Sequence, residues 1–108
     1  MYADLHIMPH TIPVATTSEI PPGEGIVVEH GELSIAVFNV EGSYLAIDNT
    51  CCHRGGPLGE GDLEGSVVTC PWHGWQYDVV SGECLSSPGE FATRYAVEVV
   101  EDQIRVLL

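Results

Sequence analysis

The chain has 108 residues, 44% of them apolar, which is enough for one compact domain with a core and too few for two. Its 16 acidic residues face only three arginines and no lysine, so the formal net charge is −13. So few cations cannot neutralise a run of phosphates. Nucleic acid and anionic lipid surfaces are therefore excluded as partners, whereas basic protein surfaces are not.

We expect no targeting signal near the N-terminus. A secretory signal peptide begins with a positively charged region, but the first cation of this chain is Arg54. The longest apolar runs, such as Ile35 to Phe38, are far shorter than the ~20 residues of a membrane span. We expect a soluble cytoplasmic protein that does not enter a membrane.

The expected secondary structure is all-β. Residues 1–11 show no clear period and are expected to form an extended lead-in, and Ser18 to Ile20 are expected to form one helical turn. Short β-branched runs then alternate with Gly, Pro, Asn and Asp, a pattern typical of strands and turns. The predicted strands span residues 12–15, 26–29, 33–39, 44–47, 66–69, 75–79, 95–100 and 104–108.

The strand pattern is interrupted twice in the middle of the chain. Between Asp48 and Pro57, and again between Cys70 and Gly74, alternation gives way to Cys, His, Gly and Pro. This change predicts two loops standing on a β-base. Loops on a rigid sheet are where binding and catalytic residues usually lie.

The two loops carry a Cys-x-His pair, Cys51 and His53, and a Cys-x-x-His pair, Cys70 and His73. Two thiolates and two imidazoles from facing loops suit zinc or an iron–sulfur cluster. A structural zinc site is thus one alternative. A disulfide between Cys52 and Cys84, the two remaining cysteines, is another possible pairing.

The residues around these pairs resemble a known family. Cys51-x-His53-Arg54-Gly55-Gly56-Pro57-Leu58 and Cys70-Pro71-Trp72-His73-Gly74-Trp75 are similar to the two cluster-binding loops of Rieske [2Fe–2S] proteins, above all the Rieske-type ferredoxins of aromatic-ring oxygenase systems. The resemblance implies the Rieske fold, an antiparallel β-sandwich or barrel with a two-loop cluster-binding subdomain. It further implies one domain over residues 1–108, cluster loops at about 48–58 and 70–77, and a proline-containing cover loop at about 86–89.

The resemblance also implies the ligand set of one Rieske-type [2Fe–2S] cluster per chain. Cys51 and Cys70 would hold one iron, and His53 and His73 the other. Two neutral imidazoles in place of thiolates remove negative charge and raise the reduction potential above that of an all-Cys cluster.

Three positions depart from the high-potential members of the family. Those proteins form a disulfide between the loops, but this chain has Gly56 and Trp72 at the corresponding positions. They also place a serine hydroxyl where this chain has Trp75. The aromatic residue that follows two positions later in those proteins is present here as Tyr77. Because hydrogen bonds to cluster sulfur stabilise the reduced form, we expect a potential below about 0 mV, low in the Rieske range.

Other conspicuous residues have simpler interpretations. Cys84 is expected to be a small buried hydrophobe, and the spacing favours Cys51 over Cys52 as the ligand. Trp72 and Trp75 are expected chiefly to shield the cluster from water. The remaining residues are expected to be solvated and not to act as ligands: His6, His10, His30, Arg54 and the charge run Glu60, Asp62 and Glu64.

The function implied is one-electron transfer, without catalysis by the chain itself. The resemblance implies a monomeric carrier that takes electrons from a ferredoxin reductase and passes them to a terminal oxygenase of aromatic hydrocarbon catabolism. The acidic surface predicts basic docking patches and a salt-sensitive association rate. The alternatives are a small Rieske-like subunit of a nitrite reductase or similar complex, and a zinc-stabilised binding module.

Overall fold

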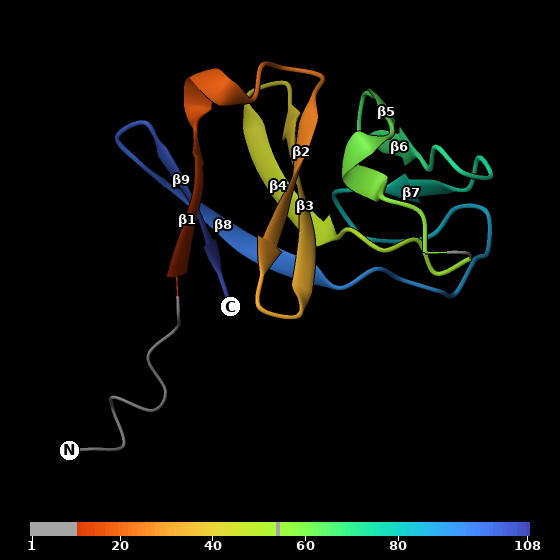
Figure 1. Cartoon of the computed structure of the whole chain (residues 1–108). Helices are drawn as coiled ribbons and strands as arrows, with labels where there is room; N and C mark the ends of the chain where they lie inside the picture. Colours follow the sequence, from red (N-terminus) through yellow and green to blue (C-terminus); the bar gives the residue numbers. More distant parts are fainter. Residues whose placement is uncertain (1–10, 54) are drawn as a thin grey trace.

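The structure is a computed structural model that describes residues 11–53 and 55–108. Within these residues the chain forms strands and two short 3₁₀ turns but no α-helix, which confirms the all-β prediction (Figure 1). The elements in chain order are β1 (Thr11–Thr16), η1 (Thr17–Glu19), β2 (Gly25–His30), β3 (Leu33–Val40), β4 (Ser43–Asp48), η2 (Leu58–Glu60), β5 (Asp62–Glu64), β6 (Val67–Thr69), β7 (Gln76–Asp78), β8 (Arg94–Val100) and β9 (Gln103–Leu107).

Six strands form the base sheet, in the order β1-β9-β8-β4-β3-β2, with every neighbouring pair antiparallel. Tight turns set the register between strands. Between β3 and β4, Glu41 and Gly42 both have positive φ, 52° and 95°, as a two-residue hairpin turn requires. The turn places Val40 opposite Ser43, and the pairing continues to Ile35 opposite Asp48.

The base sheet folds over on itself around a first core. This core joins Ile12 of β1 and Ile104 and Val106 of β9 to Ile35 and Val37 of β3. The two halves of the sheet are linked where β4 and β8 pair over only two residue pairs. Strands from opposite ends of the sheet thus face each other across the core, as expected for a sandwich or barrel base.

A second core joins the base to the small sheet β5-β6-β7, which stands at one end of the molecule (Figure 1). Ala36 and Phe38 of β3 enter this core, whereas Ile35 and Val37 enter the first one, because successive residues of a strand point to opposite faces. Phe38 is fully buried, which stabilises the fold by roughly 1.5–3 kcal/mol. Strand β3 therefore fixes the small sheet on the base.

The predicted strands agree with the observed ones to within one residue at each end, with one omission. Strand β5 was not predicted because it has three residues and two of them are charged. Asp62 and Glu64 are exposed while Leu63, between them, is half-buried, so this part of the charge run is a solvated face. The predicted turn at Ser18 to Ile20 is η1, shifted by one residue. No helix in the described residues is long and apolar enough to cross a membrane.

Candidate metal centre

The first cysteine–histidine loop joins β4 to η2 and closes on its own backbone. The amide of Cys51 donates to the carbonyl of Gly56 at 2.9 Å, and the amide of Gly55 donates to the carbonyl of Cys51 at 2.7 Å. Gly55 has φ +78°, a conformation that favours glycine. A β-bridge between Thr50 and Pro57 closes the neck of the loop. No side chain takes part in these backbone bonds.

The second loop joins β6 to β7 and repeats this closure. The amide of Cys70 donates to the carbonyl of Trp75 at 2.7 Å, and the amide of Gly74, with φ +80°, donates to the carbonyl of Cys70 at 3.0 Å. In both loops, therefore, the amide of the cysteine donates to the carbonyl of the fifth residue after it. The amide of a glycine, which is the fourth residue after the cysteine, donates to the carbonyl of the cysteine. The two loops differ in the position of the histidine, which is two residues after Cys51 and three after Cys70.

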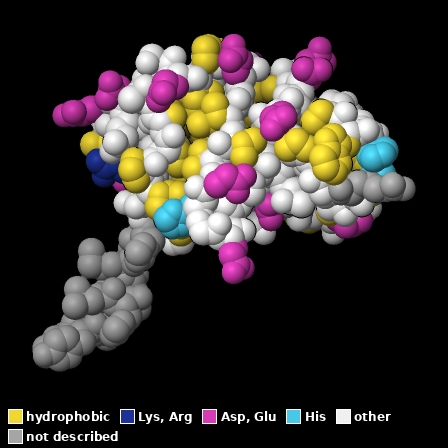
Figure 2. Space-filling view, in the orientation of Figure 1, with side chains coloured by type: hydrophobic (Ala, Val, Ile, Leu, Met, Phe, Trp, Pro, Cys, Tyr) yellow, Lys and Arg dark blue, Asp and Glu magenta, His cyan; other side chains and the backbone are white. Residues whose placement is uncertain are grey.

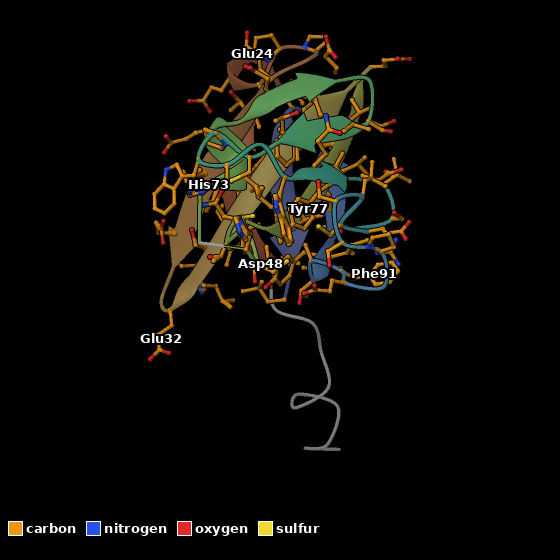
Figure 3. The ribbon with its side chains drawn as sticks, turned by 90° about the vertical axis from the view of Figure 1, so that its right-hand side faces the viewer. Glu24, Glu32, Asp48, His73, Tyr77 and Phe91 are labelled. Carbon is orange, nitrogen blue, oxygen red and sulfur yellow. The ribbon has the colours of Figure 1, made fainter. Side chains whose placement is uncertain are left out.

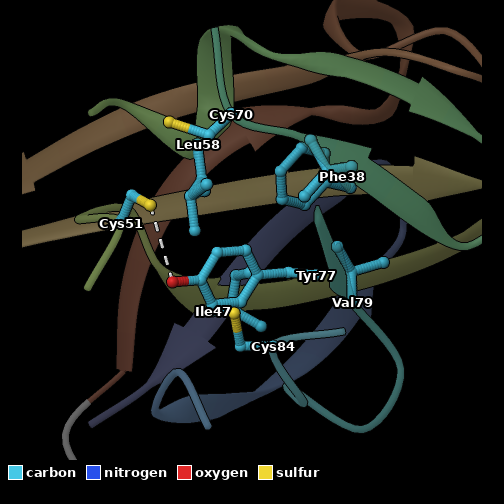
Figure 4. Close-up of a cluster of buried hydrophobic side chains, with 10 residues drawn as sticks. Phe38, Ile47, Cys51, Leu58, Cys70, Tyr77, Val79 and Cys84 are labelled. Carbon is cyan, nitrogen blue, oxygen red and sulfur yellow. Dashed lines mark hydrogen bonds between the residues drawn. The ribbon is translucent and has the colours of Figure 1, made fainter. Parts of the chain in front are cut away.

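The two thiols form the inner part of the site. Cys51 and Cys70 are 2% and 3% exposed and lie in the core shared by the two sheets (Figure 4). Burial raises the pKa of the Cys70 thiol, while hydrogen bonds from the backbone amides of Trp72 and His73 act in the opposite direction. The Cys70 thiol also hydrogen-bonds with that of Cys51, so the two sulfurs are neighbours.

The two imidazoles form the outer part. The ring centroids of His53 and His73 lie 5.2 Å apart with an angle of 87° between the ring planes, and both residues are exposed. His73 lies at the end of the molecule that carries the small sheet (Figure 3). The structure thus pairs Cys51 with Cys70 and His53 with His73, with the sulfurs buried and the rings at the surface.

The chemistry of the donor set suits an iron–sulfur cluster. Among residues 11–53 and 55–108, no three His, Cys, Asp or Glu side chains form a single group that could hold a metal ion. The candidate ligands instead form a sulfur pair and an imidazole pair, the division that two irons with different ligands need. Gly56 leaves room at the sulfur pair, because a Cβ there would lie 2.5 Å from Cys70 Sγ.

Tyr77 and Cys52 form a contact that the sequence did not predict. The Tyr77 hydroxyl donates to Cys52 Sγ at 2.9 Å and accepts the Cys52 amide at 2.9 Å, and it lies 3.6 Å from Cys51 Sγ. Burial, followed by bonds to the two cysteines, raises the pKa of Tyr77 well above its usual value, so the hydroxyl keeps its proton. Burial also raises the pKa of Cys52.

The two tryptophans have different surroundings. Trp75 stacks on the His53 ring with centroids 4.4 Å apart and planes 6° apart, as the predicted shielding requires. Trp72 is 57% exposed, so shielding is not its main role. Because it is adjacent to His73, its ring adds apolar surface beside the imidazoles.

The predicted cover loop at 86–89 is tied to the strand behind the second loop. Ser86 Oγ accepts the amide of Gln76 at 2.9 Å, and the amide of Ser87 donates to the carbonyl of Cys84 at 3.2 Å. Ser87 Oγ also donates to the Glu90 carboxylate at 2.6 Å. The bond from Gln76 holds the loop against β7, and the two bonds of Ser87 fix the shape of the loop itself.

A buried amide attaches the first loop to the base. Asn49, 6% exposed, accepts the amide of Gly59 at 2.6 Å through Oδ1 and donates to Ser34 Oγ at 3.1 Å through Nδ2. Ser34 belongs to β3, so Asn49 connects the base sheet to η2. An asparagine just before a cysteine loop is a weak sequence signal, and its role depends on a contact with a distant strand.

The other residues singled out in the sequence have no part in the site where they are described. Cys84 is fully buried, as predicted, and no disulfide joins it to Cys52. His30 is exposed at the end of β2. His6, His10 and Arg54 lie outside the described residues.

Comparisons with known proteins agree with this geometry. The Rieske [2Fe–2S] domain family matches residues 10–101. The ferredoxin component of the naphthalene 1,2-dioxygenase/salicylate 5-hydroxylase systems of Ralstonia sp is 36% identical over 77 residues, which cover 71% of this chain and 74% of that protein. A chain from the complex of reduced oxygenase and oxidised ferredoxin in carbazole 1,9a-dioxygenase is 33% identical with a TM-score of 0.84, covering 90% of this chain and 92% of that one.

A structure described as an NADH-dependent nitrite reductase small subunit from Mycobacterium tuberculosis also has a TM-score of 0.84, covering 94% of this chain and 96% of its own. Its sequence identity is 22%, so it shows a common fold alone. The family match spans most of the chain, and its relatives are ferredoxin components. The chain therefore belongs to the Rieske [2Fe–2S] domain family, has a Rieske-type cluster and is an electron carrier of the ferredoxin type rather than an enzyme.

Proposed function

We propose that Cys51 and Cys70 hold one iron of the cluster and His53 and His73 the other, and that the chain passes single electrons from a ferredoxin reductase to a terminal, aromatic-ring-hydroxylating oxygenase. The observation that carries this proposal is the buried sulfur pair behind an exposed imidazole pair. The cluster, when bound, supplies a one-electron redox couple. The imidazoles at the surface give a partner the shortest approach to it.

Several finer points belong to the same proposal. The chain acts as one monomeric domain, with residues 48–58 and 70–77 as the cluster loops and residues 86–89 as their cover. We place it in the cytoplasm, where reducing conditions keep Cys52 and Cys84 as thiols.

The charge distribution supports docking through the imidazole end. Residues 49–59, 65–77 and 84–89, which form or flank the two loops and the cover loop, contain no Asp or Glu. Carboxylates are instead spread over the body of the molecule (Figure 2). We infer that the acidic body steers approach to a basic partner at long range, while the exposed Trp72 makes the closest apolar contacts.

The ligand assignment is tested by metal analysis of anaerobically purified protein. We expect two irons and two acid-labile sulfides per chain and a Rieske-type EPR spectrum after reduction with dithionite. Cys51→Ala and Cys70→Ala should lose the cluster. Cys52→Ala and Cys84→Ala, which remove the other two cysteines, should keep it. Zinc without sulfide, or a cluster that survives loss of Cys51 but not of Cys52, contradicts the assignment.

The direction of electron flow is tested with partners. Photochemically reduced protein, mixed with a purified ring-hydroxylating oxygenase in a stopped-flow instrument, should be reoxidised, and Trp72→Ala should slow this step about tenfold if Trp72 is a central contact. As a matched control, the exposed Phe91, which lies on the opposite side of Tyr77 from His73 in Figure 3, is changed to Ala, and this variant should leave the rate unchanged. Stable co-purification with a large nitrite reductase subunit would instead favour the nitrite reductase alternative.

A further inference from the structure

The Tyr77 hydroxyl lies between the sulfurs of two consecutive cysteines. Tyr77 is 1% exposed, and its hydroxyl is 2.9 Å from Cys52 Sγ and 3.6 Å from Cys51 Sγ, the latter marked by the dashed line in Figure 4. The hydroxyl has one proton to donate, and its oxygen already accepts the amide of Cys52. The two sulfurs therefore compete for a single donor, and Cys52 is the nearer of them.

The backbone of Cys52 holds the same hydroxyl. The amide of Cys52 donates to the Tyr77 oxygen at 2.9 Å, and the hydroxyl donates to Cys52 Sγ at 2.9 Å. Two bonds therefore tie the hydroxyl to Cys52, against one longer contact of 3.6 Å with Cys51 Sγ.

We infer that Cys52 is a positioning residue that holds the Tyr77 hydroxyl proton away from the sulfur of Cys51. The inference rests on the proposed function, in which Cys51 is an iron ligand and Cys52 is not. A hydrogen bond to a ligand sulfur stabilises the reduced, more negative cluster. By diverting that bond, Cys52 lowers the reduction potential of this chain below what Tyr77 would otherwise set.

The test is an EPR-monitored redox titration of a double-mutant cycle. In Cys52→Ala the hydroxyl is released to Cys51, so at a fixed ambient potential the ratio of reduced to oxidised protein should rise about tenfold, which is about 59 mV for one electron. Tyr77→Phe alone should change the potential little. In the double variant Cys52→Ala/Tyr77→Phe the rise should disappear, because the donor is gone.

Cys84→Ala provides the matched control, since it removes the other cysteine that is not proposed as a ligand, and it should leave the potential unchanged. The inference is overturned if Cys52→Ala leaves the potential unchanged or lowers it, or if the rise persists without the Tyr77 hydroxyl. Iron and sulfide contents of the wild-type protein are measured first. A wild-type chain without them contradicts the proposed function itself, and the inference with it.

Discussion

Gly56 lies against the sulfur pair, where one added carbon atom would meet a cysteine side chain. A Cβ there would lie 2.5 Å from Cys70 Sγ and 3.1 Å from Trp72 Cγ. The thiol could turn away from such an atom, but it would then no longer point toward Cys51. The glycine is thus needed for space at the sulfur pair.

We therefore expect Gly56→Ala to fold but to lose more than half of its iron and sulfide, as measured by metal analysis with far-UV circular dichroism as the check on folding. Gly65→Ala is the control. It lies in an open turn with φ +60° and nothing near its missing Cβ, so it should lose about 1–2 kcal/mol of stability and keep the cluster. Full cluster content in Gly56→Ala would show that the second loop can adapt.

Trp75 acts at the same scale through its stacking on His53. Trp75→Ala removes the ring that covers one face of this imidazole, so water and oxygen gain access from that side. We expect the visible absorbance to bleach severalfold faster in air, and Trp75→Phe to restore most of the protection. Equal bleaching rates in all three proteins would mean that the ring does not limit access.

The strands, taken as elements, show what sequence patterns can and cannot predict. The alternation of β-branched residues with turns predicted every strand except β5, and the two loops that it predicted hold the cysteine pair and the histidine pair that the structure shows. The patterns could not predict the Cys52–Tyr77 contact or the Asn49 connection. Each of these joins residues from distant elements by one side-chain bond, and no local period reflects such a bond.

The connection through Asn49 leads to a test at this scale. Asn49→Leu leaves the buried amide of Gly59 without an acceptor, which should lower stability by about 1–3 kcal/mol and loosen the first loop. We expect a lower Tm together with faster loss of visible absorbance on heating.

Asn39 provides the comparison, because it is also a buried asparagine in the base. It bonds the carbonyl of Ile20 and the amide of Gly42, both at 2.7 Å, and it touches neither loop. Asn39→Leu should lower Tm to a similar extent without hastening cluster loss at temperatures below the unfolding transition. If both variants lose the cluster equally fast, Asn49 has no special part in holding the loop.

At the scale of the whole molecule, charge is the dominant property. The net charge is −13, and a single ion pair is present among the residues that the structure describes, Arg105 with Glu98 at 3.8 Å. Exposed pairs of this kind stabilise a fold by less than about 1 kcal/mol. Repulsion among carboxylates therefore opposes folding without much compensation.

Salt should relieve this repulsion. We expect Tm to rise by a few degrees between about 10 mM and about 0.5 M NaCl, as the screening length falls below the typical spacing of the carboxylates. KCl should act equally, since the effect does not depend on a bound cation. A Tm that is unchanged, or a difference between the two salts, would indicate that repulsion is not the controlling term.

The backbone closure of the two cysteine loops has a consequence for divergence within the family. Since no side chain takes part in either closure, the residues carried between the closing bonds can change while the loop geometry stays the same. Pro71 and Trp72 are such residues, and both are exposed. The exposed surface of this segment and the backbone that positions its cysteine are thereby separated. Substitutions at these two positions can change what the surface contacts while the backbone of the loop keeps its shape.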